Sequence, residues 1–105
     1  MHESKIKLSK HLCEERWPER GDESENLIDV WKRGADLDVY ALPFSGNDVP
    51  EHDEARFDKK TQTVIFRRGR VLVTVYNVTP EYVTNKEGKA VRSAVLKQFG
   101  PGALK

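Results

Sequence analysis

Four side chains of this chain could together perform acid–base chemistry on a phosphate ester: His11, Arg16, Arg20 and Tyr76. A histidine with an ordinary pKa of about 6.5 can accept and donate a proton near neutrality. Arginine can hold a phosphate group through two parallel N–H donors, and tyrosine can supply a hydroxyl group or stack on a base. Metal-independent RNA cleavage needs a base for the 2′-hydroxyl, a cation near the phosphate and an acid for the leaving oxygen. The four residues therefore predict a catalytic site of that kind.

Each of these residues also has a structural interpretation. A histidine near the start of a helix more often makes a structural hydrogen bond than it catalyses, and Tyr76 fits ordinary sheet packing. The two arginines can form exposed ion pairs, each contributing about 0.2–1 kcal/mol, with Glu15, Glu19 or Asp22. The sequence leaves both interpretations open.

A second set of residues is predicted to bind nucleic acid. Its members are basic and lie in the second half of the chain: Lys59, Lys60, Arg67, Arg68, Arg70, Lys89 and Arg92. A basic rim with aromatic residues between its charges suits single-stranded nucleic acid. The alternative is that the arginines beside Gly69 keep the edge of a hairpin soluble.

The charge is divided by position along the chain. Residues 1–55 contain 14 acidic and 7 basic side chains, whereas residues 56–105 contain 3 acidic and 11 basic ones. The two parts nearly cancel, so the net charge of the whole chain is only +1. The basic part is expected to attract RNA or an acidic protein surface, and the acidic part suits a basic partner surface. The alternative is that both parts are solvated surface.

The length of 105 residues fits a single domain over residues 1–105, because a second core would be too small to be stable. The chain has no run of about 18 apolar residues, so no membrane span is expected. Residues 1–10 lack an apolar segment, so they are not expected to form a secretory signal. Cys13 is the single cysteine and cannot form an internal disulfide, which fits the cytoplasm of a cell or of an infected host cell.

No cofactor and no metal site is predicted. The chain has no glycine-rich phosphate loop, no Cys-x-x-Cys pair and no Ser-His-Asp spacing. His52 stands among acidic residues, but their spacing lacks the order of a zinc ligand set. Any catalysis is therefore expected to depend on protein side chains alone.

Two short helices are expected before residue 35. Ser9 is a plausible N-cap of the first helix, and Pro18 should kink or end it. In the second helix, Asp22–Glu25 resembles a capping box and Ser24 is a competing cap. Gly34 is expected to follow the last residue of that helix.

Strands are expected over residues 37–42, 54–58, 62–68 and 70–78, with a loop at 43–53 and a tight turn at 58–61. In the last strand, alternation should turn Val71, Val73 and Val75 to one face and Leu72, Thr74 and Tyr76 to the other. Both faces are fairly apolar, so this strand is predicted to be central in an antiparallel sheet.

The C-terminal part is expected to form an extension over residues 79–105. A short helical turn is predicted at Thr79–Glu81, a turn at 85–88 and a helix over 89–99, with frayed residues after Gly100. The elements together predict an α+β fold, in which two N-terminal helices pack on a small antiparallel sheet and a C-terminal helix follows.

Two groups of short motifs carry a family resemblance over about residues 6–78. The first group is Leu8-Ser9-Lys10-His11, Arg16 and Glu19-Arg20-Gly21; the second is Phe57-Asp58-Lys59-Lys60-Thr61 and Val73-Thr74-Val75-Tyr76. In order and spacing they resemble the domain family labelled DUF4258. That family is thought to share the fold of the RelE, colicin E5 and barnase-like ribonuclease toxins. The resemblance implies a helical start, an antiparallel sheet and a toxin-type ribonuclease activity, with an antitoxin as a partner.

Two hypotheses of function follow from the sequence. The first is a small metal-independent ribonuclease of toxin type, acting on RNA through His11 with arginine support. The second is a non-catalytic binding protein, such as a virus-encoded inhibitor of a host enzyme, that docks on a macromolecular partner through its acidic and basic faces. The ordered motifs favour the first hypothesis, and the divided charge favours the second.

Overall fold

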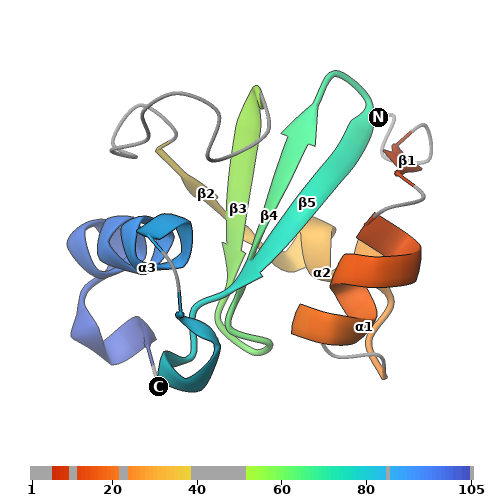
Figure 1. The fold of residues 1–105 in the computed structure, drawn as a ribbon. Coiled ribbons are helices and arrows are strands. Elements are labelled where there is room, and N and C mark those ends of the chain that lie inside the picture. Colours follow the sequence, from red (N-terminus) through yellow and green to blue (C-terminus); the bar gives the residue numbers. More distant parts are fainter. Residues whose placement is uncertain (1–5, 10–11, 22–23, 39–51, 85, 105) are drawn as a thin grey trace.

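A computed structural model describes residues 6–9, 12–21, 24–38, 52–84 and 86–104 of the chain (Figure 1). It contains one five-stranded sheet with the strand order β1-β5-β4-β3-β2. The strands are β1 (Lys7–Leu8), β2 (Ala35–Leu37), β3 (Glu54–Asp58), β4 (Thr63–Arg68) and β5 (Val71–Asn77). β1 runs parallel to β5, and all other neighbouring strands are antiparallel. The predicted α+β fold is confirmed, with a mixed sheet in place of a purely antiparallel one.

Helices cover both faces of this sheet. The N-terminal helices α1 (Trp17–Arg20) and α2 (Leu27–Arg33) lie on one face, and α3 (Lys86–Phe99) lies on the other (Figure 1). Successive side chains of β4 point to opposite faces of the sheet and belong to two different hydrophobic cores. Ile65 packs with the N-terminal helices, whereas Val64 and Phe66 pack with α3. Both faces of β4 are therefore buried, and β4 rather than β5 is the middle strand of the sheet.

A β-bulge in β5 contradicts the predicted alternation of that strand. Phe66 pairs with Thr74, but the next residue of β4 pairs with Leu72, which leaves Val73 as an extra residue. An extra residue shifts every later side chain to the opposite face. Leu72 therefore shares the N-terminal core with Val75, whereas Tyr76 belongs to the core under α3. Strict alternation predicted Leu72 and Tyr76 on one face.

The first helical segment continues through the proline that was expected to kink or end it. Ser9 acts as the predicted cap, because its Oγ accepts a hydrogen bond from the Leu12 N–H (3.0 Å). A π-helical turn, Leu12–Arg16, leads directly into α1. Pro18 lies in the first turn of α1, a position whose φ of about −65° suits the proline ring. The chain therefore changes helical type at this point instead of leaving the helix.

The second helix begins later than the predicted capping box. Asn26 is its N-cap, and the Asn26 Oδ1 accepts hydrogen bonds from the N–H groups of Ile28 (2.9 Å) and Asp29 (3.2 Å). Glu25 instead pairs with basic side chains outside the cap, and Asp22 lies outside the described residues. The predicted end at Gly34 is confirmed.

The strand predicted over residues 37–42 also differs from the observed one. β2 ends at Leu37, where the strand was expected to begin. Beyond it, the side-chain amide of Gln98 accepts from the Asp38 N–H (2.8 Å) and donates to the Asp36 carbonyl oxygen (2.8 Å). A side chain of α3 thus replaces a strand partner at this edge. Residues 39–51, with the rest of the predicted strand and most of the predicted loop, lie outside the described residues.

The C-terminal extension is more ordered than expected. α3 starts at Lys86, so Glu87 and Gly88 belong to the helix instead of the predicted turn, and an acidic residue in the first turn suits the helix dipole. Pro101–Ala103 form a 3₁₀ turn. The Ala103 carbonyl oxygen accepts a hydrogen bond from Gln62 Nε2 (2.9 Å), so the residues after Gly100 are attached to the sheet. The short helical turn predicted after Thr79 is confirmed as Pro80–Tyr82.

An ion pair between the exposed Arg33 and the buried Asp58 connects α2 to the end of β3. Arg33 Nε and Nη2 donate to the two carboxylate oxygens of Asp58 at 2.8 and 2.7 Å. The Thr61 N–H and Oγ1 donate to the same carboxylate at 3.1 and 2.6 Å. Burial raises the pKa of Asp58, but the hydrogen bonds from Arg33 and Thr61 outweigh burial and hold this pKa below its usual value.

We expect Asp58→Asn to lower the free energy of unfolding at neutral pH and to reduce the loss of stability in acid. A carboxyl group whose pKa is lower in the folded than in the unfolded protein stabilises the fold at pH values above its unfolded pKa of about 3.9. This contribution disappears as the pH falls through the pKa of the folded protein. Urea unfolding, followed by the fluorescence of the buried Trp17 and Trp31 from neutral pH to about pH 2, measures the effect. Asp29→Asn, at an exposed position of α2, is the matched control. Equal acid sensitivity of Asp58→Asn and the native protein would contradict the assignment.

Candidate active site

Arg20 is held at the open edge of β5. β1 pairs with only Val71 and Leu72, so the remainder of that edge faces no strand among the described residues. Arg20 Nη1 donates a hydrogen bond to the Val75 carbonyl oxygen (3.0 Å). The Arg20 carbonyl oxygen accepts one from Asn77 Nδ2 (2.7 Å). The strand edge therefore positions both the backbone and the guanidinium group of this arginine.

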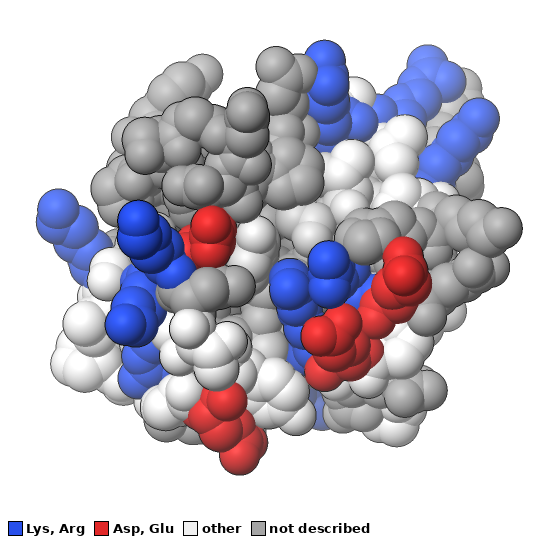
Figure 2. All heavy atoms as spheres, viewed as in Figure 1, with Lys and Arg blue, Asp and Glu red and all other residues white. Residues whose placement is uncertain are grey.

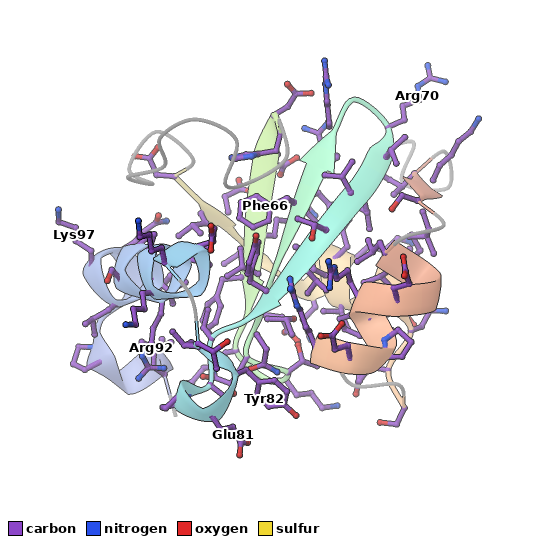
Figure 3. All side chains as sticks on the ribbon, viewed as in Figure 1. Phe66, Arg70, Glu81, Tyr82, Arg92 and Lys97 are labelled. Atoms are coloured by element: carbon purple, nitrogen blue, oxygen red, sulfur yellow. The ribbon has the colours of Figure 1, made fainter. Side chains whose placement is uncertain are left out.

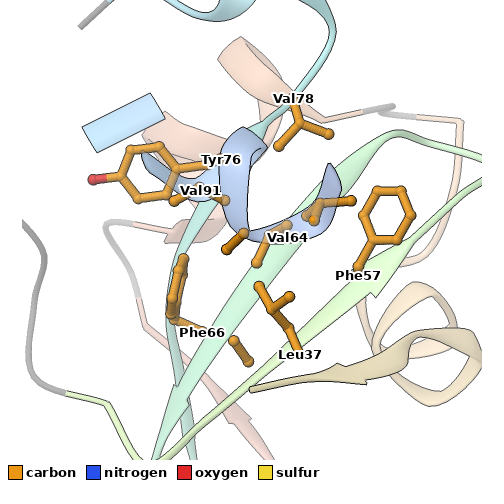
Figure 4. Close-up of a cluster of buried hydrophobic side chains, with 10 residues drawn as sticks. Leu37, Phe57, Val64, Phe66, Tyr76, Val78 and Val91 are labelled. Atoms are coloured by element: carbon orange, nitrogen blue, oxygen red, sulfur yellow. The ribbon is translucent and has the colours of Figure 1, made fainter. Parts of the chain in front are cut away.

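Tyr76 lies under that guanidinium group. The Arg20 guanidinium carbon is 5.0 Å from the centre of the Tyr76 ring, which is a cation–π distance. The ring packs edge-on against Phe66, with 5.8 Å between the ring centres. Figure 4 shows the phenol oxygen of Tyr76 pointing away from the other side chains of this core. The ring is thus anchored in the core while the hydroxyl group remains at its border.

The protonation of Tyr76 depends on its surroundings. Burial raises the pKa of the phenol, and the negative charge of Glu87 raises it further. The nearby charges of Arg20 and Arg16 act in the opposite direction, but the pKa remains raised. Tyr76 is therefore a neutral hydroxyl group at neutral pH, able to donate a hydrogen bond or a proton.

Arg16 lies one helical turn before Arg20 and is already paired. Its Nη1 is 3.2 Å from the Glu19 Oε2, and both side chains are partly exposed. A pair of this kind contributes little to stability, on the order of 0–1 kcal/mol. A phosphate group can therefore compete with Glu19 for Arg16 at small cost to the fold.

A cavity of about 300 Å³ joins these residues to the C-terminal extension. One side consists of residues from α1 and β5: Glu19, Arg20, Tyr76 and Asn77. The other side consists of residues that follow β5: Glu81, Tyr82, Thr84 and Gly88. The structure thus brings Arg16, Arg20 and Tyr76 into one region. The fourth predicted catalytic residue, His11, lies outside the described residues, so its place beside the cavity stays a prediction.

Tyr82 is a residue of this cavity that the sequence analysis missed. It ends the 3₁₀ turn Pro80–Tyr82 and is 47% exposed, although it is a large aromatic residue. Figure 3 shows it together with Glu81 at the end of the sheet that lies away from Arg70. An exposed aromatic ring at the border of a cavity is a stacking surface for a base. Its position six residues after Tyr76 did not predict a place in the same cavity, because the segment between the two residues is irregular.

The predicted nucleic-acid-binding residues do not form one surface. Arg68 and Arg70 flank Gly69 in the β4–β5 turn, at one end of the sheet. Lys59 and Lys60 lie in the β3–β4 turn, at the other end of β4, about 20 Å away for a six-residue strand. Lys89 and Arg92 lie on α3.

Several of these cations are already paired. Arg67 forms two contacts with the Glu54 Oε1, through Nε (2.9 Å) and Nη2 (2.8 Å). Lys60 Nζ lies 2.9 Å from the Glu25 Oε2. Arg92 donates a hydrogen bond to the Val78 carbonyl oxygen. The acidic first half of the chain thus neutralises part of the basic second half.

Lys7 is a basic residue that the sequence analysis did not include in this set. Val71 of β5 pairs with Lys7 of β1 on one side and with Arg68 of β4 on the other. Residues in register share a face of the sheet, and Val71 lies opposite to Leu72, on the face that carries Tyr76. Figure 2 shows lysine and arginine side chains around the β4–β5 turn and over α3, whereas basic and acidic side chains lie side by side over α1.

A comparison with protein families identifies the class of protein. A profile described as "Putative RelE superfamily toxin domain" matches residues 8–79, and the chain belongs to this family. The match confirms the toxin superfamily that the motifs indicated. A search of the curated proteins found no significant match, and a search of the solved structures found none either. Among the described residues, no helix is long and apolar enough to cross a membrane.

We expect Arg20→Gln to raise the pKa of Tyr76 further, because it removes a positive charge that favours the phenolate. Titration of the protein with ¹³C-labelled tyrosine, followed by NMR, resolves each phenol. Arg70→Gln is the matched control, since Arg70 lies at the opposite end of the sheet from Tyr82 (Figure 3). An unchanged or lowered Tyr76 pKa in the Arg20 variant would show that the guanidinium does not interact with the ring in solution.

Proposed function

We propose that this protein is a metal-independent ribonuclease of toxin type, of the DUF4258-like kind that its motifs resemble, and that it cleaves single-stranded RNA at the cavity beside Arg20 and Tyr76. The observation that carries the proposal is the Arg20 guanidinium, held over a buried tyrosine in a cavity of about 300 Å³ in a chain that belongs to a RelE superfamily toxin family.

The proposed chemistry assigns one role to each side chain. Arg20 and Arg16 bind the scissile phosphate and stabilise the charge that develops on it. His11 removes the proton from the 2′-hydroxyl group, and the oxygen attacks the phosphorus. The neutral Tyr76 hydroxyl donates a proton or a hydrogen bond to the leaving 5′-oxygen. No step requires a metal ion.

The substrate is expected to extend from the cavity toward the β4–β5 turn. Tyr76 and Arg70 are six residues apart along β5, a distance of about 20 Å in a strand. Lys7 and Arg68 lie on the Tyr76 face at that far end. Phosphate contacts at this position would hold an RNA strand several nucleotides long without reading its sequence.

The proposal includes a protein partner and a cellular location. Members of a toxin family need an inhibitor in the cell that makes them, so an antitoxin is the expected partner of this chain. RNA as the substrate places the activity in the cytoplasm.

A non-catalytic binding protein is the second candidate, and one observation favours it. Glu19 and Glu81 line the same cavity as Arg20, and Glu19 pairs with Arg16. Carboxylates repel a phosphate group, so the cavity then suits a cationic or polar group of a protein partner better than RNA. The cleavage experiment separates the two candidates.

We expect the purified protein to cleave a labelled single-stranded RNA in the presence of EDTA. His11→Ala and Arg20→Gln should each lower the rate by about 10²-fold or more, because a proton carrier or a positioned cation typically contributes that much. The rate is measured from product bands under single-turnover conditions. Arg20→Lys should recover only part of the rate, because lysine lacks the planar pair of donors.

Thermal unfolding of each variant is the control for this experiment. His11→Ala should leave the melting temperature nearly unchanged, and Lys32→Ala, at an exposed position of α2, should leave both rate and stability unchanged. A His11 variant that unfolds, or one that cleaves at the native rate, contradicts the catalytic role of the histidine. Absence of cleavage by the native protein favours the binding candidate.

We expect Tyr82→Ala to weaken RNA binding by about 1–3 kcal/mol, since one stacked base is worth that amount, whereas Tyr82→Phe should bind like the native protein. Fluorescence anisotropy with His11→Ala protein measures binding without cleavage. Because Tyr82 is half exposed, neither variant should lose stability. Equal affinities of the Ala and Phe variants would exclude stacking on this ring.

A further inference from the structure

An apolar groove lies at the end of α3 that is farther from the candidate active site. Its volume is about 630 Å³. Its apolar lining comes from β2, β3 and the C-terminal extension: Ala35, Phe57, Phe99 and Ala103. Two lysines of the β3–β4 turn, Lys59 and Lys60, also line it. The groove is separate from the cavity beside Tyr76, since none of its lining residues contributes to both.

The floor of the groove is aromatic and firmly built. The Phe57 ring belongs to the core under α3 and is 4% exposed. Phe99, the last residue of α3, packs against it with 5.4 Å between the ring centres. The 3₁₀ turn with Ala103 is attached to the sheet through the hydrogen bond from Gln62. A preformed apolar groove of this kind can bind a large side chain without rearranging.

The border of the groove is positively charged. Arg33 also lines it, but its Nε and Nη2 donate to Asp58, which is 3% exposed, and its Nη1 donates to Glu25. The Lys60 side chain is 64% exposed, and its Nζ lies 2.9 Å from the Glu25 Oε2. Lys59 is exposed as well. The two lysines are therefore the groups that a ligand would meet first.

This combination fits an acidic peptide better than RNA. RNA binds chiefly through phosphate contacts to several cations, whereas the lining here offers the apolar side chains of Ala35, Phe57, Phe99 and Ala103. The apolar lining is useful only to a ligand with an aliphatic or aromatic side chain to bury. We propose that this groove binds an acidic amphipathic segment of a partner protein, which lays an apolar side chain over Phe57, Phe99 and Ala103 and places carboxylates beside Lys59 and Lys60.

The test starts with a selection of peptides from a random library on the immobilised protein. The expected result is an enriched motif with one large apolar residue flanked by Asp or Glu. A fluorescent synthetic peptide with that motif is then titrated against the native protein and against two variants, Ala35→Arg and Lys59→Glu. Ala35 and Lys59 are exposed, so both substitutions should leave the fold intact, and thermal unfolding checks this.

We expect each variant to bind the peptide at least about tenfold more weakly, since one blocks the groove and the other reverses its charge. The matched control is Lys97→Glu, which makes the same charge change on α3, where Figure 3 shows the side chain pointing away from the sheet. NMR shifts on binding should concentrate on Phe57, Lys59, Phe99 and Ala103.

Three outcomes would overturn the proposal: selection without an acidic apolar motif, equal loss of affinity in the Lys97 variant, or shifts located at the Tyr76 cavity. Binding of a labelled single-stranded RNA that Ala35→Arg abolishes would assign the groove to nucleic acid instead. The peptide measurements contain no RNA, so their result is independent of the cleavage experiment. Ala35→Arg should cleave RNA at the native rate if the two sites are separate.

Discussion

The hydrogen bond between Arg20 and the Val75 carbonyl oxygen is the contact on which the candidate active site depends. It requires two irregularities of the sheet. β1 is only two residues long, so it leaves the edge of β5 open beyond Leu72. The bulge at Val73 exchanges the faces to which the later side chains of β5 point. Val75 therefore packs toward the N-terminal helices, and Tyr76 lies on the other face. Together these features let a residue of α1 reach around the edge and cover a tyrosine on the far side of the sheet.

The acidic and basic halves of the chain form ion pairs with each other in the fold, which the charge totals of the two halves do not show. Glu25 and Glu54, from the acidic half, neutralise Lys60, Arg56 and Arg67 of the basic half. Such partly exposed pairs contribute little stability individually, but they remove cations from any nucleic-acid surface. On the face shown in Figure 2, basic side chains lie in separate groups, among them one around the β4–β5 turn and one on α3. An RNA strand would therefore meet charge at separate places instead of one continuous surface.

The C-terminal extension lines the cavity beside Arg20 and also the apolar groove. The family match ends at residue 79, yet Tyr82 and Gly88 line the cavity beside Arg20, and Phe99 and Ala103 line the apolar groove. The extension is held by burial of Val91 and Val95 under the sheet and by the Gln98 amide at the edge of β2. A family core of helices and sheet is thus completed by residues that follow it, and these residues shape what the two sites can accept.

Local physical chemistry let the sequence alone determine the fold class, the β3–β5 hairpins, the Ser9 cap and the grouping of Arg16 and Arg20, because turns, caps and helical spacing act between near neighbours. Tertiary structure decided the rest. Asn26 caps the second helix while Glu25 pairs with Arg33 and Lys60, and the face of Tyr76 depended on a bulge with no local signal. The pairing of Arg20 with Tyr76, 56 positions later in the numbering, and the cavity wall at Tyr82 arise only when the edge of β5, α1 and the extension meet. Contacts of that range are set by how whole elements pack, which periodicity along the chain does not encode.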